Sequence, residues 1–254
     1  MAGGFRHHDS DGNDLTPFLK LGTFSEHMVL SVDSAIKVEN WLPPIPVALV
    51  SCGVTSGYGS AVYRAAVTAG DTVVVVGIGG LGAAALQGAK LAGARHIMAV
   101  DPVEWKREKA LEFGATHTAP SMEEAMGMVN ELTWGVNADS VILTPGTLDG
   151  AMIGQAQGLT RKGGTIVVTA LAPMEQMDVQ LNLFMFAMFN QELKGVLFGS
   201  TSPRKEIPRL LAMYDSGQLM IDEMVTTTYP LDDINQGYQD MRDAKNIRGV
   251  ITFD

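Results

Sequence analysis

The sequence predicts an α/β protein built on a doubly wound parallel sheet with helices on both faces. Residues 72–76, TVVVV, form a continuous β-branched run, which is typical of a strand buried on both faces. From Val47 onward, short apolar runs alternate with helical segments rich in small residues. This alternation requires strand-helix-strand crossovers and therefore a parallel sheet.

Length and composition exclude several classes of protein. A chain of 254 residues corresponds to one large domain or two small ones at about 100–200 residues each. With 46% hydrophobic and 18% charged residues it is neither disordered nor a membrane bundle. No uninterrupted apolar run reaches the length of a membrane span, and no signal peptide opens the chain, so we expect a cytoplasmic protein.

The net charge of −10 disfavours nucleic acid and anionic membranes as partners. The densest basic run, residues 106–109, is interrupted by Glu108 and is expected to be a solvated helix face. The single cysteine, Cys52, can form no internal disulfide and no Cys-rich structural zinc site.

The first 45 residues are polar and rich in loops. Alternation predicts a strand at residues 22–30 and a second short strand at residues 35–38. Two strands in so short a segment cannot bury a core, so we interpret this region as the tail of a β-rich unit that packs on later segments.

The remaining elements follow in order along the chain. Strands are predicted at 72–76, 97–100, 140–143 and 165–168, with another beginning at His117, and helices at 81–94, 104–113, 123–132 and 150–159. Beyond Pro173 we predict a strand at 196–198, helices at 203–217 and 232–244, and a last strand at 249–253.

One segment carries more large apolar residues than an amphipathic face can bury. Within residues 181–189 these are Leu181, Leu183, Phe184, Met185, Phe186, Met188 and Phe189. The segment is either an association surface or a locally folded part of the core.

The glycine-rich turn of residues 77–82, GIGGLG, directly follows the strand 72–76 and opens a helix, as a dinucleotide fingerprint requires. Gly77 makes the tight turn, Gly79 lets the backbone approach the pyrophosphate, and Gly82 allows close packing of helix on strand. Gly80 completes the predicted cofactor-binding glycines. The alternative is a glycine turn without a ligand.

Asp101 ends the second strand, 19 residues after Gly82. A carboxylate there accepts the ribose hydroxyls of adenosine and repels a 2′-phosphate, which favours NAD over NADP. The alternative is an ordinary surface aspartate.

Two other enzyme classes with this fold fit less well. A short-chain dehydrogenase needs a tyrosine followed four residues later by lysine, and no tyrosine here has one. A methyltransferase usually has an acidic residue just before the glycine loop, where this chain has Val76.

Three segments resemble the zinc-dependent medium-chain alcohol dehydrogenases: CGVTSGYG at 52–59, GDTVVVVGIGGLG at 70–82 and EFGATH at 112–117. Residues 100–108, 197–200 and 246–251 are similar to the actinobacterial branch that depends on nitrosodimethylaniline and is associated with mycofactocin. The resemblance extends from about Leu21 to the C-terminus. It implies a Rossmann sheet combined with part of a β-rich, GroES-like catalytic domain.

The resemblance also implies roles for single residues. Cys52, which from the residues alone is more typical of a small core residue than of a ligand, matches one of three ligands of a catalytic zinc. Ser56 stands where the family usually has threonine, beside the nicotinamide. Asp101 and Lys106 match contacts to the adenosine ribose, and Arg248 matches an arginine that reaches the pyrophosphate.

The early cysteine, the His-Glu pair and the structural zinc loop of that family have no counterpart, so we expect the sequence to be N-terminally truncated relative to it. His7, His8 and His27 are expected to be surface or strand residues, and His96 and His117 to be structural.

The resemblance implies three parts: residues 1–53 from the catalytic domain, an NAD-binding Rossmann domain at 54–196, and a return segment at 197–254. The expected function is that of an NAD-dependent, zinc-dependent alcohol dehydrogenase, acting on an alcohol or aldehyde as a homodimer or higher homo-oligomer. The alternative is a non-catalytic NAD(H)-binding protein or subunit that has lost the zinc site.

Overall fold

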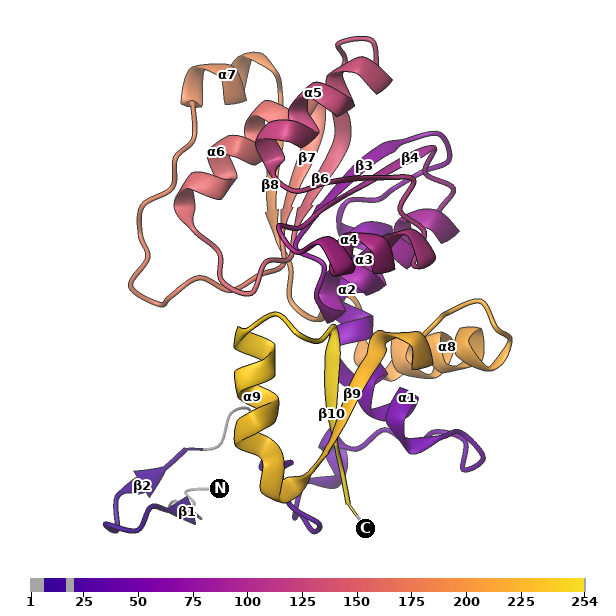
Figure 1. Ribbon diagram of the computed structural model, residues 1–254, viewed down its shortest axis with the longest axis vertical. Helices are drawn as coiled ribbons and strands as arrows, with labels where there is room; N and C mark the ends of the chain where they lie inside the picture. The colour runs from indigo at the N-terminus through magenta and orange to yellow at the C-terminus, as the bar shows by residue number, and fades with distance from the viewer. Residues whose placement is uncertain (1–6, 17–20, 254) are drawn as a thin grey trace.

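The computed structural model describes residues 7–16 and 21–253, and its largest sheet is a six-stranded parallel sheet, the central sheet, in the upper half of Figure 1. The strand order is β5-β4-β3-β6-β7-β8, and every neighbouring pair is parallel. The strands are β3 (Thr72–Val76), β4 (His96–Val100), β5 (His117–Ala119), β6 (Ala138–Leu143), β7 (Thr160–Val168) and β8 (Glu192–Gly195). The predicted α/β fold class is confirmed.

The sheet buries side chains on both faces because its strands are apolar at successive positions. All five residues of β3 are buried. Val73 and Val75 belong to one core cluster, whereas Val74 and Val76 belong to a second cluster on the opposite face.

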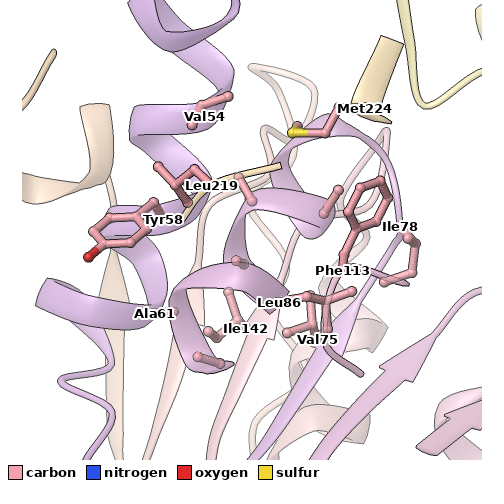
Figure 2. Close-up of a cluster of buried hydrophobic side chains, with 14 of the residues drawn as sticks. Val54, Tyr58, Ala61, Val75, Ile78, Leu86, Phe113, Ile142, Leu219 and Met224 are labelled. Carbon is pink, nitrogen blue, oxygen red and sulfur yellow. The ribbon is translucent and has the colours of Figure 1, made fainter. Parts of the chain in front are cut away.

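Helices cover the two faces separately. Core residues of α3 and Phe113 after α4 join the first cluster, and those of α5 and α6 join the second. The helices are α3 (Gly80–Leu91), α4 (Glu104–Glu112), α5 (Met122–Leu132) and α6 (Gly150–Leu159). Each lies within a few residues of its prediction. Figure 2 shows the first cluster, where Leu86 and Phe113 pack near Val75 and Ile142 of the sheet.

A long helix precedes the sheet. It runs from Pro44 to Arg64 through α1 (Pro44–Leu49), η3 (Val50–Val54), α2 (Thr55–Gly59) and η4 (Ser60–Arg64). It is long and apolar enough to cross a membrane, but 56% of its most apolar window is buried inside the protein, as in a core helix. The predicted domain boundary between residues 53 and 54 lies inside this helix, and the domain division stays a prediction.

The predicted strands at 22–30 and 35–38 are wrong. Both stretches are irregular, and residues 22–30 are exposed throughout. Alternation alone makes no strand without a partner, and Ile36 and Val38 instead pack against the first core cluster. Among the described residues of this region, the strands are the short pair β1 (His7–His8) and β2 (Asp14–Leu15), and a 3₁₀ turn, η2 (Val32–Ser34), follows later in the chain.

The last sheet strand is β8 at Glu192–Gly195, so the predicted strand at 196–198 is misplaced. Phe198, Gly199 and Ser200 all have positive φ, which ends the strand and forms the turn η5 (Phe198–Ser200). Between β7 and β8 lies the short helix α7 (Leu183–Met188).

The C-terminal segment leaves the sheet and returns to the long helix (Figure 1). It consists of α8 (Pro203–Asp215), η6 (Asp222–Met224), β9 (Val225–Pro230), η7 (Leu231–Asp233), α9 (Ile234–Arg242) and β10 (Arg248–Thr252). Strand β9 was not predicted. It pairs in parallel with β10 as a separate two-stranded sheet.

Candidate functional site

The glycine turn follows β3 at the point where the strand order reverses, between β3 and β6. Gly77 has φ +90°, and a side chain there would also press on Pro145. A Cβ on Gly82 would overlap the Gly77 carbonyl oxygen, so the helix starts as close to the strand as the backbone allows. The Thr144 hydroxyl donates to the Gly77 carbonyl at 2.8 Å and fixes the turn from the β6 side.

The open side of the turn lies at Gly79. Gly79 is the N-cap of α3 with no side-chain cap, and nothing lies within 4 Å of where its Cβ would be. The first backbone N–H groups of a helix are unsatisfied and attract anions. The space and polarity at this helix end suit a phosphate group.

Asp101 is buried directly after β4 and holds the turn through the backbone. One carboxylate oxygen accepts from the Ile78 N–H at 2.7 Å, and the other accepts from the Val103 N–H at 2.9 Å. Each oxygen retains a further lone pair that can accept from a hydroxyl. Asp101 therefore supports the glycine turn and can still bind a sugar.

Lys106 lies on α4 close to Asp101. The interpretation of residues 106–109 as a solvated face is wrong for Lys106, which is only 9% exposed. Burial lowers the pKa of the Lys106 ammonium, and the Asp101 charge opposes this shift. Helix α4 buries this stem because its start is held at the end of β4, where Arg107 donates to the Asp101 carbonyl at 2.8 Å.

Arg248, at the start of β10, reaches the turn from the far end of the chain. Its guanidinium fills the space beside both Gly53 and Gly80, because a Cβ on either glycine would overlap it. The Arg248 Nε is buried and has no hydrogen-bond partner among the described residues. Burial lowers the pKa of this guanidinium, and the Cys52 sulfur opposes the shift. A buried, unpaired cation next to a helix N-terminus fits a bound anion.

Cys52 and Ser56 lie one helical turn apart on the long helix. Cys52 is exposed, so the alternative of a small core residue is wrong. The Ser56 carbonyl accepts from the Ser60 hydroxyl, which also contacts the Thr169 hydroxyl at 2.8 Å. Gly57 packs directly on the Leu81 carbonyl of α3, which brings this helix to the glycine turn.

The described residues do not form a zinc site. In residues 7–16 and 21–253, no group of three or more His, Cys, Asp or Glu side chains is placed to hold a metal ion. His8 pairs with Asp14 at 3.0 Å, and His27 is exposed. His96 and His117 begin β4 and β5 as predicted, and their rings lie 5.7 Å apart.

The structure thus brings together the four glycines, Asp101, Lys106 and Arg248, with Cys52 and Ser56 on the adjoining helix. Sequence reasoning missed Thr144 and Gly53. Thr144 could have been found from its place after the β6 strand, since the switch point lies between the first and fourth strands of such a sheet. The sequence carries no signal that Gly53 makes room for Arg248.

Comparisons with known proteins show which family the chain resembles. Residues 80–216 match the zinc-binding dehydrogenase family. Alcohol dehydrogenase B of Mycobacterium tuberculosis is 49% identical over 95% of this chain and 64% of its own length. The NDMA-dependent alcohol dehydrogenase of Amycolatopsis methanolica is 49% identical over 98% of this chain and 67% of its own length. The chain thus spans about two thirds of these relatives.

Among solved structures, benzyl alcohol dehydrogenase from Acinetobacter calcoaceticus superposes with a TM-score of 0.80 at 29% identity. The match covers 86% of this chain and 59% of that one.

Proposed function

Since the chain belongs to the zinc-binding dehydrogenase family, we propose that it binds NAD(H) at the glycine turn and serves an alcohol dehydrogenase reaction. In that reaction a hydride passes between an alcohol or aldehyde and the nicotinamide ring. The domain division at 1–53, 54–196 and 197–254 belongs to the same proposal.

The observation that carries the proposal is the buried Nε of Arg248 without a partner in the described structure. An unpaired guanidinium in a buried position is costly unless an anion binds to it. The cofactor pyrophosphate, placed at Gly79, would accept from Arg248 and from the first N–H groups of α3.

Asp101 and Lys106 are proposed to bind the adenosine ribose. The Asp101 carboxylate accepts from the ribose hydroxyls, and its charge repels the 2′-phosphate of NADP. Lys106, held near Asp101 by burial of its stem, donates to the same sugar. Preference for NAD over NADP follows from the carboxylate.

The nicotinamide supplies the chemistry, because its C4 accepts or donates the hydride. In our proposal Ser56 lies on the nicotinamide side and fixes the ring through its hydroxyl. Cys52, one turn earlier and exposed, is the proposed zinc ligand. The described residues offer no set of ligands around it, so they do not by themselves fit a catalytic zinc.

The lack of a ligand group around Cys52 among the described residues supports a second candidate function, a non-catalytic NAD(H)-binding protein or subunit. Cys52 belongs to no group of three potential metal ligands within the described ranges. The two candidates differ in the metal, because the dehydrogenase reaction of this family requires zinc and cofactor binding does not.

We also propose self-association through the edge of the sheet and a cytoplasmic location. Strand β8 is an edge strand, and no residue of α7 beside it is buried. Leu183 and Phe184 are each 72% exposed, although Leu181 at the start of the segment packs against the second core cluster. Pairing of two β8 edges would cover it.

The experiment that tests cofactor binding is titration of the purified chain with NADH and NADPH, followed by nicotinamide fluorescence. We expect tighter binding of NADH. Equal or tighter binding of NADPH would contradict the role of Asp101, and absence of binding to either would contradict the proposal as a whole.

A further inference from the structure

Arg248 is placed at the glycine turn by a strand that does not belong to the central sheet. The segment before it, residues 203–224, packs on the long helix and then leads into β9, the only partner of β10 in the described structure. Two polar links, each with a buried partner, hold this segment so that Arg248 reaches Gly80.

The first link joins α8 to the long helix. The Glu206 side chain is completely buried, and the Tyr63 hydroxyl donates to its two oxygens at 2.9 Å. Arg209, one turn later, donates to the same carboxyl at 3.0 Å. Burial and the neighbouring Glu206 raise the pKa of Tyr63 to about 12, so the hydroxyl remains a donor at neutral pH.

The second link joins the end of the segment to α3, the helix that starts at the glycine turn. The Gln87 side-chain amide accepts from the Met220 N–H at 2.7 Å and donates to the Met220 carbonyl at 3.1 Å. Gln87 is buried, so loss of this pair leaves polar backbone groups without partners.

Beyond Met220 the connection to Arg248 is short. The Thr226 hydroxyl on β9 accepts from the Ile247 N–H at 3.0 Å, directly before Arg248. Displacement of residues 203–224 would therefore be transmitted through β9 to Arg248.

We propose that Glu206 and Gln87 are positioning residues for the cofactor, holding residues 203–224 so that Arg248 lies at the glycine turn. This inference rests on the proposed function. Neither residue contacts the open side of the turn at Gly79, so any effect on cofactor affinity passes through Arg248. A buried carboxyl and a buried amide tolerate only one arrangement of partners, whereas apolar contacts tolerate several. The two polar links therefore hold the segment in one position.

The test combines Gln87→Leu, Glu206→Gln and Tyr63→Phe with Arg248→Ala. Tyr63→Phe keeps the Glu206–Arg209 pair and guards against loss of folding in Glu206→Gln. Asp139→Asn is the control, because it breaks the ion pair with Arg161 (2.5 Å) in strand β7, away from Arg248. We expect the dissociation constant for NADH to rise about 3- to 10-fold in the positioning variants and to stay unchanged in the control.

The decisive comparison is made in the Arg248→Ala background. If Glu206 and Gln87 act through Arg248, their substitutions cause no further loss of NADH affinity there. Equal losses in both backgrounds, or unchanged affinity in folded variants, would overturn the inference.

Hydrogen exchange measured without cofactor tests the positioning role independently of whether the chain binds NADH. We expect amide exchange in residues 247–251 to become about 10-fold faster in the positioning variants and not in Asp139→Asn. Unchanged exchange would overturn the inference. Failure of the unaltered chain to bind NADH would overturn only the proposed function.

Discussion

The central sheet and the segments that flank it differ in how their structure is specified. Every strand of the sheet pairs with a neighbour supplied by residues 72–195, and its two faces are covered largely by helices of the same stretch. The described flanking segments, before residue 65 and after residue 196, pair strands only with each other, in the two-stranded sheets β1-β2 and β9-β10. These segments join the first core cluster through residues such as Val50, Leu210 and Ile221.

The two regions supply different residues of the candidate site. Residues 72–195 provide the glycine turn, Asp101 and Lys106, which are local to the sheet. The flanking segments provide Cys52, Ser56 and Arg248. Cofactor binding should therefore depend on both regions, whereas folding of the sheet should depend mainly on the first.

The largest expected contrast is between cofactor binding and catalysis. We expect the purified chain to bind NADH but to hold no stoichiometric zinc and to reduce no NAD with primary alcohols. The reason is that a catalytic zinc needs three protein ligands, and Cys52 is in no such group among the described residues. Elemental analysis and absorbance at the NADH band measure both. Stoichiometric zinc with turnover would show that His8, His27 or residues outside the described ranges complete the site.

A substitution in the glycine turn should disrupt both the folding of residues 72–195 and cofactor binding. Gly82→Val should lower the free energy of unfolding by about 3 kcal/mol or more and abolish NADH binding, because its Cβ overlaps the Gly77 carbonyl. Urea unfolding and NADH titration measure the two effects. Gly127→Ala on α5 is the control. Its Cβ meets open space, so the free energy of unfolding should rise by about 0.5–1 kcal/mol.

Asp101 tests specificity within the same region. Asp101→Ala should reduce the preference for NADH over NADPH by about tenfold or more, because the charge that repels the 2′-phosphate is lost. It should also lower stability by about 1–3 kcal/mol, since the Ile78 and Val103 N–H groups lose their acceptor. Parallel titrations with both cofactors measure the preference. An unchanged ratio would exclude Asp101 as the discriminating group.

The exposed edge of the sheet tests the proposed self-association. Phe184→Glu on α7 should weaken the dimer about tenfold or more, since burial of one large apolar side chain contributes about 2 kcal/mol. Sedimentation velocity at several concentrations measures the effect. Leu111→Glu, a comparably exposed leucine on α4, is the control and should leave the dimer intact. A monomeric parent chain would contradict the proposal.

The smallest effect concerns pH and the start of β4. Burial, together with Arg95 and His117, lowers the pKa of His96 below its usual value. The unfolded chain therefore binds this proton at a higher pH, so stability should fall as pH decreases from about 6.5 toward the folded pKa. His96→Gln should remove this part of the acid sensitivity. Unfolding midpoints measured between pH 5 and 8 give the comparison, and an identical slope in the variant would contradict it.

The sequence predicted the sheet well because its signals are local. The β-branched run of β3, the glycine turn after it and the Ala-rich α3 are contiguous in the chain. It failed for β8, where Glu192 and Lys194 give an edge strand a charged pattern. The long helix was missed because prolines at its start and Gly53, Gly57 and Gly59 within it are typical of loops.

The same reasoning explains what was predictable of the site. The glycines and Asp101 follow from motif and spacing, and their role in binding the cofactor stays a prediction. Cys52, Ser56 and Arg248 came only through resemblance. The buried links of Glu206 and Gln87 were not predictable, because each partner is remote in sequence, as Tyr63 and Glu206 are.

The contact of Arg248 with Gly53 and Gly80 has a consequence for the order of folding. Nearly the whole sheet lies between Gly80 and Arg248 along the chain, so this contact closes one of the longest loops in the molecule. Long loops close late, because their entropy cost must be met by structure already formed. During refolding the far-ultraviolet signal of sheet and helices should therefore appear before the ability to retain NADH. During synthesis, the cofactor cradle can assemble only after Arg248 has left the ribosome.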